Sequence, residues 1–234
     1  MKLALIEAND ISKYYLTGAE KVSALKRTDF NIDKGDFIVI NGPSGSGKTT
    51  LLNILSGIDE VSSGEILFGN KDLNKLSDRE STLLRREKIG LVFQSFELIP
   101  VLSAWENVEY PLLLNDITKD ERKRRVDKIL AQVGLEKLSD HLPSQLSGGQ
   151  RQRVAVARAL VSEPEIVLAD EPTGNLDTET GKEIIELMID LNEKKDVAFL
   201  IVTHDLFINE YAERLIKIRD GVLREVSSNV ESCL

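Results

Sequence analysis

A glycine-rich segment near the N-terminal end of the chain has the residue types needed to bind a triphosphate. Residues 42–49 read Gly-Pro-Ser-Gly-Ser-Gly-Lys-Thr, which fits the pattern G-x-x-x-x-G-K-[ST]. Glycines let a backbone wrap with its N–H groups pointing inward, and such a loop at a helix N-terminus binds phosphate. Lys48 adds a cation for the β- and γ-phosphates, and Thr49 offers a hydroxyl to Mg²⁺. The loop therefore predicts binding of a nucleoside triphosphate with Mg²⁺.

Two carboxylates follow a short apolar run later in the chain. Residues 166–169 are Ile-Val-Leu-Ala, and Asp170 and Glu171 come directly after them. Consecutive residues of a strand point to opposite faces, so the two carboxylates cannot do the same work. An acidic residue at this place in a phosphate-loop protein holds Mg²⁺, which is the role we expect for Asp170. Glu171, at the strand exit, is placed to orient or deprotonate a water in line with the γ-phosphate.

A glycine pair opens another predicted helix. Leu146-Ser147-Gly148-Gly149-Gln150 directly precedes the helical pattern that runs to Leu160. A helix N-terminus has free N–H groups and partial positive charge, so this is a second anion-binding end in one chain. Two such ends suit one triphosphate if each comes from a different protomer. Taken alone, the pentapeptide would indicate only a serine N-cap followed by flexible glycines.

Strand-like and helix-like patterns alternate around these residues, which predicts an α/β fold. Short apolar runs are typical of strands buried on both faces of a parallel sheet, and they occur at 36–41, 89–93, 166–169 and 197–202. Helices are predicted at 50–55 and 179–192. A glycine-bounded strand at 64–69 and a hairpin turning at Asp220-Gly221, between 215–218 and 222–224, add antiparallel pairing.

A helical segment interrupts this α/β pattern. Helical patterns at 103–114, 118–133 and 148–161 follow one another with almost no strand pattern between them. We therefore expect a single domain, with residues 1–94 and 164–226 as the nucleotide-binding α/β core and its antiparallel β subdomain. Residues 95–163 form the inserted α-helical subdomain, and residues 227–234 are expected to be a flexible tail.

Composition excludes several classes of protein. The 234 residues are 41% hydrophobic, too apolar for a disordered chain, and a single cysteine cannot form an internal disulfide. No apolar run approaches the ~20 residues that a membrane-spanning helix needs. The net charge of -9 weighs against a generic nucleic-acid binder. The basic run at 122–125 is flanked by acidic residues, so we interpret it as a solvated helix face rather than a lipid or nucleic-acid patch.

The motifs together resemble those of ATP-binding cassette (ABC) transporter ATPases over essentially the whole chain. Residues 146–150 are similar to the family signature, and the other motifs stand in the family's order. The resemblance implies that Tyr15 stacks on adenine, with neighbouring Tyr14 as the competing candidate. It also implies that Gln94 joins the Mg²⁺ site and senses a transmembrane partner.

The resemblance further implies how the remaining residues act. Asp177, in the loop 174–177, couples two sites across a dimer, and His204 contacts the γ-phosphate. The implied cofactors are ATP and Mg²⁺, and the implied reaction is ATP hydrolysis coupled to transport. The resemblance implies that the catalytic residues are Glu171, His204 and Lys48. It implies that the Mg²⁺ ligands are Thr49, Gln94 and Asp170. The nucleotide contacts are Tyr15, Gly42, Ser44, Gly45, Ser46, Gly47, Lys48, Thr49, Thr50, Gln94, Ser147, Gly148, Gly149, Gln150 and Asp177.

Residues 93–108 and 170–177 are similar to the lipoprotein-release, macrolide-export and antimicrobial-peptide-efflux members of that family. This resemblance implies export, a second copy closing as an ATP-sandwich dimer, and a separate integral-membrane permease docking near Gln94 and the helical subdomain. The chain would then lie at the cytoplasmic face of the membrane, with no nucleic-acid partner. Asn41 and Trp105 depart from the pattern, because a small or apolar residue and a leucine are expected there.

Two other functions fit the same motifs. One is a cassette ATPase without a transporter, as in DNA repair, chromosome maintenance or translation. Such relatives usually carry two cassettes, a coiled coil or basic extensions, which this sequence does not show. The other is a regulator of cell-wall hydrolases that acts through a membrane protein and transports nothing.

Overall fold

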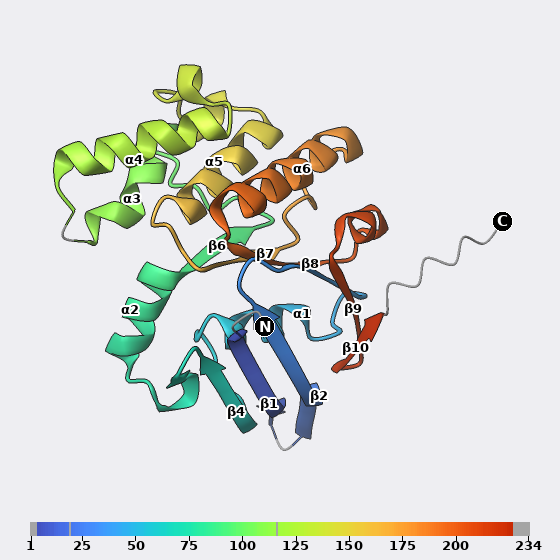
Figure 1. Cartoon of the computed structure of the whole chain (residues 1–234). Coiled ribbons are helices and arrows are strands. Elements are labelled where there is room, and N and C mark those ends of the chain that lie inside the picture. Colours follow the sequence, from blue (N-terminus) through green and yellow to red (C-terminus); the bar gives the residue numbers. More distant parts are fainter. Residues whose placement is uncertain (1–3, 19, 116, 227–234) are drawn as a thin grey trace.

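The structure, a computed structural model, describes residues 4–18, 20–115 and 117–226 and is built on two β-sheets (Figure 1). The expected tail at 227–234 lies outside the described residues. The strands are β1 (Ala4–Thr17), β2 (Glu20–Asp33), β3 (Phe37–Asn41), β4 (Ser63–Phe68), β5 (Lys71–Asp72), β6 (Ile89–Phe93), β7 (Ile166–Asp170), β8 (Ala198–Thr203), β9 (Arg214–Arg219) and β10 (Val222–Val226). The α-helices are α1 (Lys48–Leu55), α2 (Asp78–Lys88), α3 (Ala104–Leu113), α4 (Lys119–Gln132), α5 (Gly148–Leu160) and α6 (Thr178–Lys195). Short 3₁₀ turns lie at Leu73–Lys75, Glu136–Leu138, Pro143–Gln145 and Leu206–Tyr211.

The larger sheet has six strands in the order β10-β9-β3-β8-β7-β6. Only the β9–β10 hairpin is antiparallel among its described pairs; the pairs from β9 to β6 are parallel. Alternate residues of its central strands enter opposite cores, as shown by Val39 and Phe199 on one side and Ile40 and Leu200 on the other. Both faces of the sheet are therefore covered, which is why these strands are continuously apolar in the sequence.

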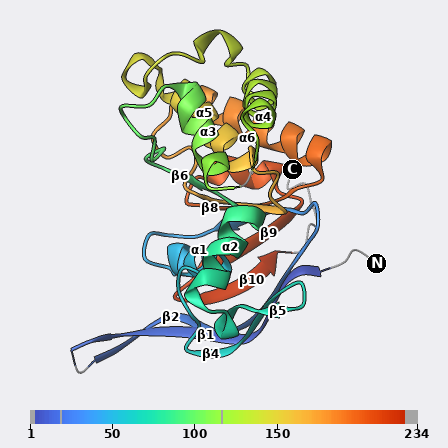
Figure 2. The ribbon, with the colours of Figure 1, turned by 90° about the vertical axis from the view of Figure 1, so that its left-hand side faces the viewer.

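A different layer of secondary structure packs against each face of the six-stranded sheet. Helices α3, α4, α5 and α6 lie over one face, and α1 with the four-stranded sheet β2-β1-β4-β5 lies over the other (Figure 1). Seen from the side, the β1–β2 hairpin extends well beyond the rest of the second layer (Figure 2). The phosphate-loop helix α1 is thus held between the two sheets.

The expected strands, the helices within 95–163 and the C-terminal hairpin are all present, to within a few residues at their ends. The sequence reasoning missed the β1–β2 hairpin and helix α2. Register shifts interrupt the pairing of β1 with β2 at several points, which destroys the two-residue alternation that reveals a strand. Helix α2 is largely polar, but it begins with a capping box formed by Ser77 and Glu80, a signal that the sequence does contain.

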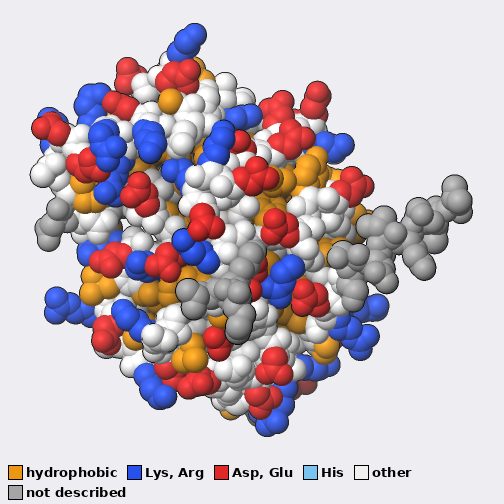
Figure 3. Space-filling model, viewed as in Figure 1, with side chains coloured by type: hydrophobic (Ala, Val, Ile, Leu, Met, Phe, Trp, Pro, Cys, Tyr) orange, Lys and Arg blue, Asp and Glu red, His pale blue; other side chains and the backbone are white. Residues whose placement is uncertain are grey.

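The basic run on α4 has two exposed cations, Lys123 and Arg124, as expected for a solvated helix face, whereas Arg122 and Arg125 are half-buried. Its four cations each have a carboxylate partner: Arg122 with Glu109, Lys123 with Asp127, and Arg124 and Arg125 with Glu121. Hydrogen bonds from Arg124 and Arg125 lower the pKa of Glu121 to about 2. Blue and red side chains are mixed over the face shown in Figure 3, without a continuous basic stripe.

Substitution of Phe199 tests how much the core around the central sheet contributes to the stability of the fold. The Phe199 side chain is fully buried, and its ring centroid lies 5.8 Å from that of Phe37 on the adjacent strand. Phe199→Ala leaves a cavity between β8 and the helical layer, so we expect a loss of about 3–5 kcal/mol in the free energy of unfolding. Urea denaturation measures this, with Leu16→Ala as the control, because the side chain of Leu16 on β1 is exposed. Equal effects of the two substitutions would contradict the assignment of the core.

Candidate active site

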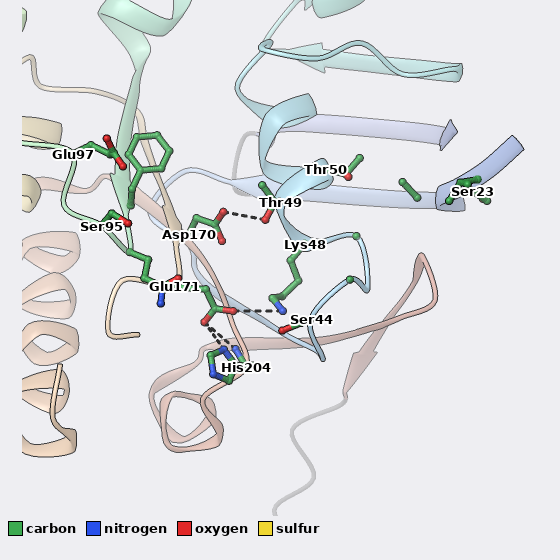
Figure 4. Close-up of a pocket in the computed structure, with 16 residues that line it drawn as sticks. Ser23, Ser44, Lys48, Thr49, Thr50, Ser95, Glu97, Asp170, Glu171 and His204 are labelled. Atoms are coloured by element: carbon green, nitrogen blue, oxygen red, sulfur yellow. Dashed lines mark hydrogen bonds and ion pairs between the residues drawn. The ribbon is translucent and has the colours of Figure 1, made fainter. Parts of the chain in front are cut away.

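A pocket of about 690 Å³ lies at the carboxyl ends of β3, β6, β7 and β8 (Figure 4). The ends of parallel strands meet at one edge of a sheet, which is where ligands bind in open α/β folds. Five segments distant in sequence supply the polar residues: β2, the phosphate loop with the start of α1, the segment after β6, the end of β7 with Glu171, and the segment after β8. The expected site residues that line it are Ser44, Gly45, Gly47, Lys48, Thr49, Thr50, Gln94, Asp170, Glu171 and His204.

The phosphate loop wraps closely enough that glycine is required. A Cβ on Gly47, whose φ is 106°, would lie 2.4 Å from the carbonyl oxygen of Ala24. A Cβ on Gly42 would lie 2.2 Å from the carbonyl oxygen of Ile218. Lys48 is buried, and its Nζ donates to the carbonyl oxygens of Gly42 at 2.7 Å and Pro43 at 3.1 Å. In the described chain no side chain caps α1, so the N–H groups of its first turn are available to an anion.

The two carboxylates at the end of β7 have separate partners, as expected. Thr49 Oγ1 donates to Asp170 Oδ2 at 3.0 Å, which joins the start of α1 to the end of β7 (Figure 4). Burial raises the pKa of the Asp170 carboxyl, partly offset by the hydrogen bond from Thr49. A hydroxyl, a carboxylate and the Gln94 amide facing one pocket are the hard oxygen donors that Mg²⁺ prefers. The residues present therefore fit a Mg²⁺ ion between Thr49, Gln94 and Asp170.

Glu171 turns away from the strand direction, toward the phosphate loop and His204. Its φ of 47° is unusual for a residue other than glycine, and such strain is common at functional sites. One carboxylate oxygen, Oε1, lies 3.5 Å from Lys48 Nζ, and the other, Oε2, lies 2.9 Å from His204 Nδ1 (Figure 4). The hydrogen bond with Glu171 is the main reason why the pKa of His204 is raised. Lysine, carboxylate and imidazole thus form one cluster of ionisable side chains in the pocket.

Gln94 and the loop that follows Glu171 are in contact. Asn175 Nδ2 donates to the carbonyl oxygen of Gln94 at 2.9 Å, and a Cβ on Gly174 would lie 2.7 Å from Gln94 Nε2. Asp177 caps helix α6, because its carboxylate accepts from the N–H of Thr180 at 3.0 Å. This loop therefore connects the pocket to the start of α6.

The signature segment lies outside the pocket. Ser147 and Gln150 form a capping box at the start of α5, which occupies the N–H of Gln150 and leaves those of Gly148 and Gly149 available. A Cβ on Gly149 would lie 2.5 Å from Thr180, the residue that Asp177 binds. Ser147–Gln150 and Asp177 thus form one surface, separate from the pocket that holds Lys48 and Glu171.

Tyr15 and Tyr14 have different surroundings. The Tyr15 hydroxyl donates to Asp59 at 2.7 Å and also contacts the side chain of Thr50 on α1; burial and Asp59 raise its pKa. The Tyr14 ring lies 3.4 Å from Lys21 Nζ. Consecutive strand residues face opposite ways, so the contact with Thr50 favours Tyr15 as the adenine platform. Tyr15 does not itself line the pocket, so the assignment stays a prediction.

Sequence reasoning missed Thr203, Asn41 and the residues of β2 that line the pocket, Val22, Ser23 and Ala24. Thr203 Oγ1 donates to Glu171 Oε2 at 3.0 Å. Asn41 Nδ2 donates to the carbonyl oxygen of Asp205 at 3.2 Å. The available signals were the position of Thr203 beside His204 and the unusual polarity of Asn41 before the phosphate loop.

Comparison with known proteins agrees with this site. The ABC transporter family profile matches residues 25–174. A Methanocaldococcus jannaschii protein described as an uncharacterized ABC transporter ATP-binding protein, MJ0796, is 46% identical over 221 residues, covering 93% of this chain and 94% of its own. The chain belongs to the ABC transporter family. It is an ABC ATPase, with the P-loop NTPase fold of that family.

The comparison also found a lipoprotein-release relative and a solved structure. The lipoprotein-releasing system ATP-binding protein LolD of Legionella pneumophila (strain Lens) is 45% identical over 219 residues, covering 94% of this chain and 96% of the relative. A dimeric structure of MJ0796 in a post-hydrolysis state, bound to ADP and Pi, aligns with a TM-score of 0.86 at 45% identity, covering 94% of this chain and 97% of that one. In residues 4–18, 20–115 and 117–226, no helix combines the length and apolar character needed to cross a membrane.

The contact between His204 and Glu171 predicts a pH dependence. A group whose pKa is raised on folding adds stability at low pH, and that stability is lost as the pH rises through the raised pKa. We therefore expect His204 to titrate above its ordinary pKa of 6.5 and the pair to be lost above that midpoint. NMR of the His204 side chain as a function of pH measures this midpoint. Glu171→Gln should lower the His204 midpoint; an unchanged midpoint would contradict the pairing.

Proposed function

We propose that this chain is the ATP-hydrolysing motor of a membrane transporter, that two copies close around two ATP molecules, and that their closure drives a separate membrane subunit. One observation carries the proposal: Lys48, Asp170, Glu171 and His204 share a pocket, whereas the signature segment lies on a different surface. The free N–H groups at the start of α5 cannot serve the pocket of their own chain from there. They are suited to complete the pocket of a second copy.

The residues of the pocket divide the work of hydrolysis. Lys48 and the N–H groups of the phosphate loop hold the β- and γ-phosphates of the ATP substrate. Glu171 orients and deprotonates the attacking water, and His204 stabilises charge that develops on the γ-phosphoryl group. Bound Mg²⁺, held by Thr49, Gln94 and Asp170, would neutralise phosphate charge.

Self-association is supported by relatives and by the geometry of the signature. MJ0796 is dimeric, and in one structure it holds ADP and Pi. In a two-fold symmetric dimer each copy gives its Ser147–Gln150 surface to the other, so that two equivalent composite sites form. Asp177, which lies in that surface, is then positioned to link the two sites.

A groove between the α/β core and the helical segment suits a membrane partner. This groove, of about 410 Å³, lies between α2, β6, α3 and α5. Phe93, Tyr110 and Leu114 give it an apolar and partly exposed wall. Trp105 is not part of it, because this side chain packs in the helical core and donates to Asp127 at 2.8 Å.

The groove also carries positive charge that favours an acidic occupant. Arg86 and Arg158 line it and donate hydrogen bonds to backbone carbonyl oxygens. Arg86 also lies 3.6 Å from a carboxylate oxygen of Glu87. Arg86 Nε and the hydroxyl of Ser162 are buried and have no hydrogen-bond partner among the described residues. We propose that a short amphipathic segment of the permease docks here, with apolar residues against Tyr110 and a carboxylate near Arg86.

The relatives also support a proposal for the direction of transport and the location of the chain. LolD acts in lipoprotein release, which supports export by the transporter that this chain serves. The chain would then sit at the cytoplasmic face of the membrane, bound through the permease. Residues 95–163 carry Tyr110 and Leu114 of the groove wall and also the signature, so we propose that this subdomain moves as a unit to connect ATP binding with the permease.

Glu171→Gln tests the catalytic assignment. Glutamine keeps the shape of the side chain but cannot accept the proton of water, so ATP should still bind while hydrolysis falls by about 100-fold or more. The unhydrolysed nucleotide should then hold the two copies together. Phosphate release and the mass measured by light scattering with and without ATP check both effects. Parental turnover in the variant would show that Glu171 is not the base.

Arg86→Glu tests the groove. Reversal of this charge should repel a carboxylate of the permease, so we expect several-fold less of the purified chain to bind membrane vesicles that contain the permease. Arg79→Glu is the matched control, because Arg79 is an exposed residue on the same helix outside the groove. Hydrolysis by the isolated chain should be the same for both variants. Equal binding by both would place the docking surface elsewhere.

A further inference from the structure

A buried threonine connects the end of β8 to the carboxylate of Glu171. Thr203 is fully buried. Its hydroxyl accepts from the N–H of Asp205 at 3.0 Å and donates to Glu171 Oε2 at 3.0 Å. The donor on one side of the hydroxyl oxygen directs its single proton to the other side, toward Glu171. The hydrogen bond therefore has a defined direction.

The two oxygens of Glu171 have different surroundings as a result. Oε2 is met by the Thr203 hydroxyl, by the backbone N–H of His204 at 3.1 Å and by His204 Nδ1 at 2.9 Å. Oε1 has only the longer contact with Lys48 Nζ, at 3.5 Å, among the described residues. Oε2 is thus saturated as an acceptor, and Oε1 is the oxygen left to take a proton.

The topology of the sheet explains why Thr203 can do this. Strand β8 lies between β3, which leads into the phosphate loop, and β7, which leads to Glu171. The N–H of Gly42 donates to the carbonyl oxygen of Thr203 at 3.1 Å, and the N–H of Glu171 donates to that of Val202 at 2.9 Å. The backbone at the end of β8 therefore holds the phosphate loop on one side and Glu171 on the other.

Two polar side chains fix the residue that orients Thr203. Asn41 Nδ2 donates to the carbonyl oxygen of Asp205 at 3.2 Å, and Thr173 Oγ1 donates to Asp205 Oδ2 at 2.8 Å. Asn41 and Thr173 are both buried and come from opposite sides of β8. This gives a function to the polar residue before the phosphate loop, which departs from the family pattern.

We propose that Thr203 is a positioning residue that anchors Glu171 through Oε2 and so presents Oε1 to the attacking water. Asn41 and Thr173 act indirectly: they hold Asp205 in place, and the N–H of Asp205 orients the Thr203 hydroxyl. The inference rests on the proposed role of Glu171 as the base. In that step the water oxygen bonds to the γ-phosphorus, Oε1 takes a proton from the water, and the bond to the bridging oxygen breaks with its electron pair leaving on ADP.

Thr203→Val tests the anchor, because valine keeps the branched shape but has no hydroxyl. A carboxylate held by fewer contacts spends less time in line with the water, so kcat should fall by about 10- to 100-fold. KM for ATP should stay the same, since Thr203 does not contact the nucleotide site directly. Thr203→Ser restores the hydroxyl and should recover most of kcat. Thr28→Val, on strand β2 away from the pocket, is the matched control.

Asn41→Ala gives a second test that does not touch Thr203. It should lower kcat less than Thr203→Val and again leave KM unchanged, and it carries the test if Thr203→Val does not fold by circular dichroism. Asn192→Ala is its control, because Asn192 is also buried and donates to backbone carbonyl oxygens, but at Gly35 and Val197.

The results separate this inference from the proposed function. If Glu171→Gln is inactive and Thr203→Val retains the parental kcat, Glu171 is the base and Thr203 does not position it. If Thr203→Val raises KM, or if Thr203→Ser is as impaired as Thr203→Val, the residue acts through packing and the inference is wrong. If Glu171→Gln retains full activity, the proposed function itself fails.

Discussion

The parallel pairing of β3, β8 and β7 is the constraint on which the site depends. Register places Asn41 beside Thr203 and Asp170 beside Val202, so the three strands end at the same level. The segments that follow these strand ends carry Lys48, His204 and Glu171. These three side chains come together in the fold although they are far apart in the sequence. A slip of one residue in either pairing would turn the side chains of a strand to the opposite core. The apolar cores on both faces of the sheet therefore also fix the geometry of the active site.

The charge distribution is consistent with a protein that binds a polyanion although its net charge is -9. The phosphate loop needs only one cation, Lys48, because backbone N–H groups supply the other contacts. Lys48 is buried next to Glu171, so its charge acts in a region of low dielectric constant. The local field of the pocket is thus independent of the surface, where cations such as those of α4 are paired with carboxylates.

Much of the fold and part of the site could be predicted from the sequence because the signals are local. The phosphate loop is a continuous segment, and the central strands are recognisable as apolar runs. The β1–β2 hairpin could not be found this way, because its bulges break the alternation of polar and apolar residues. Thr203 and Asn41 were missed for a different reason. Their partners, Glu171 and Asp205, are brought to them only by the order of strands in the sheet.

The position of the signature explains why this ATPase would act as a switch and not only as a hydrolase. The capping box of α5 satisfies the N–H of Gln150 within its own chain, and the N–H groups of Gly148 and Gly149 are left for an external anion. Because this helix end lies on another surface than Lys48 and Glu171, one chain cannot place both on the same triphosphate. In the proposed dimer, the contacts of α5 with the triphosphate would form only when two copies approach. The helical segment that carries α5 also carries Tyr110 in the wall of the groove, so in this proposal the same approach would move the surface that binds the permease.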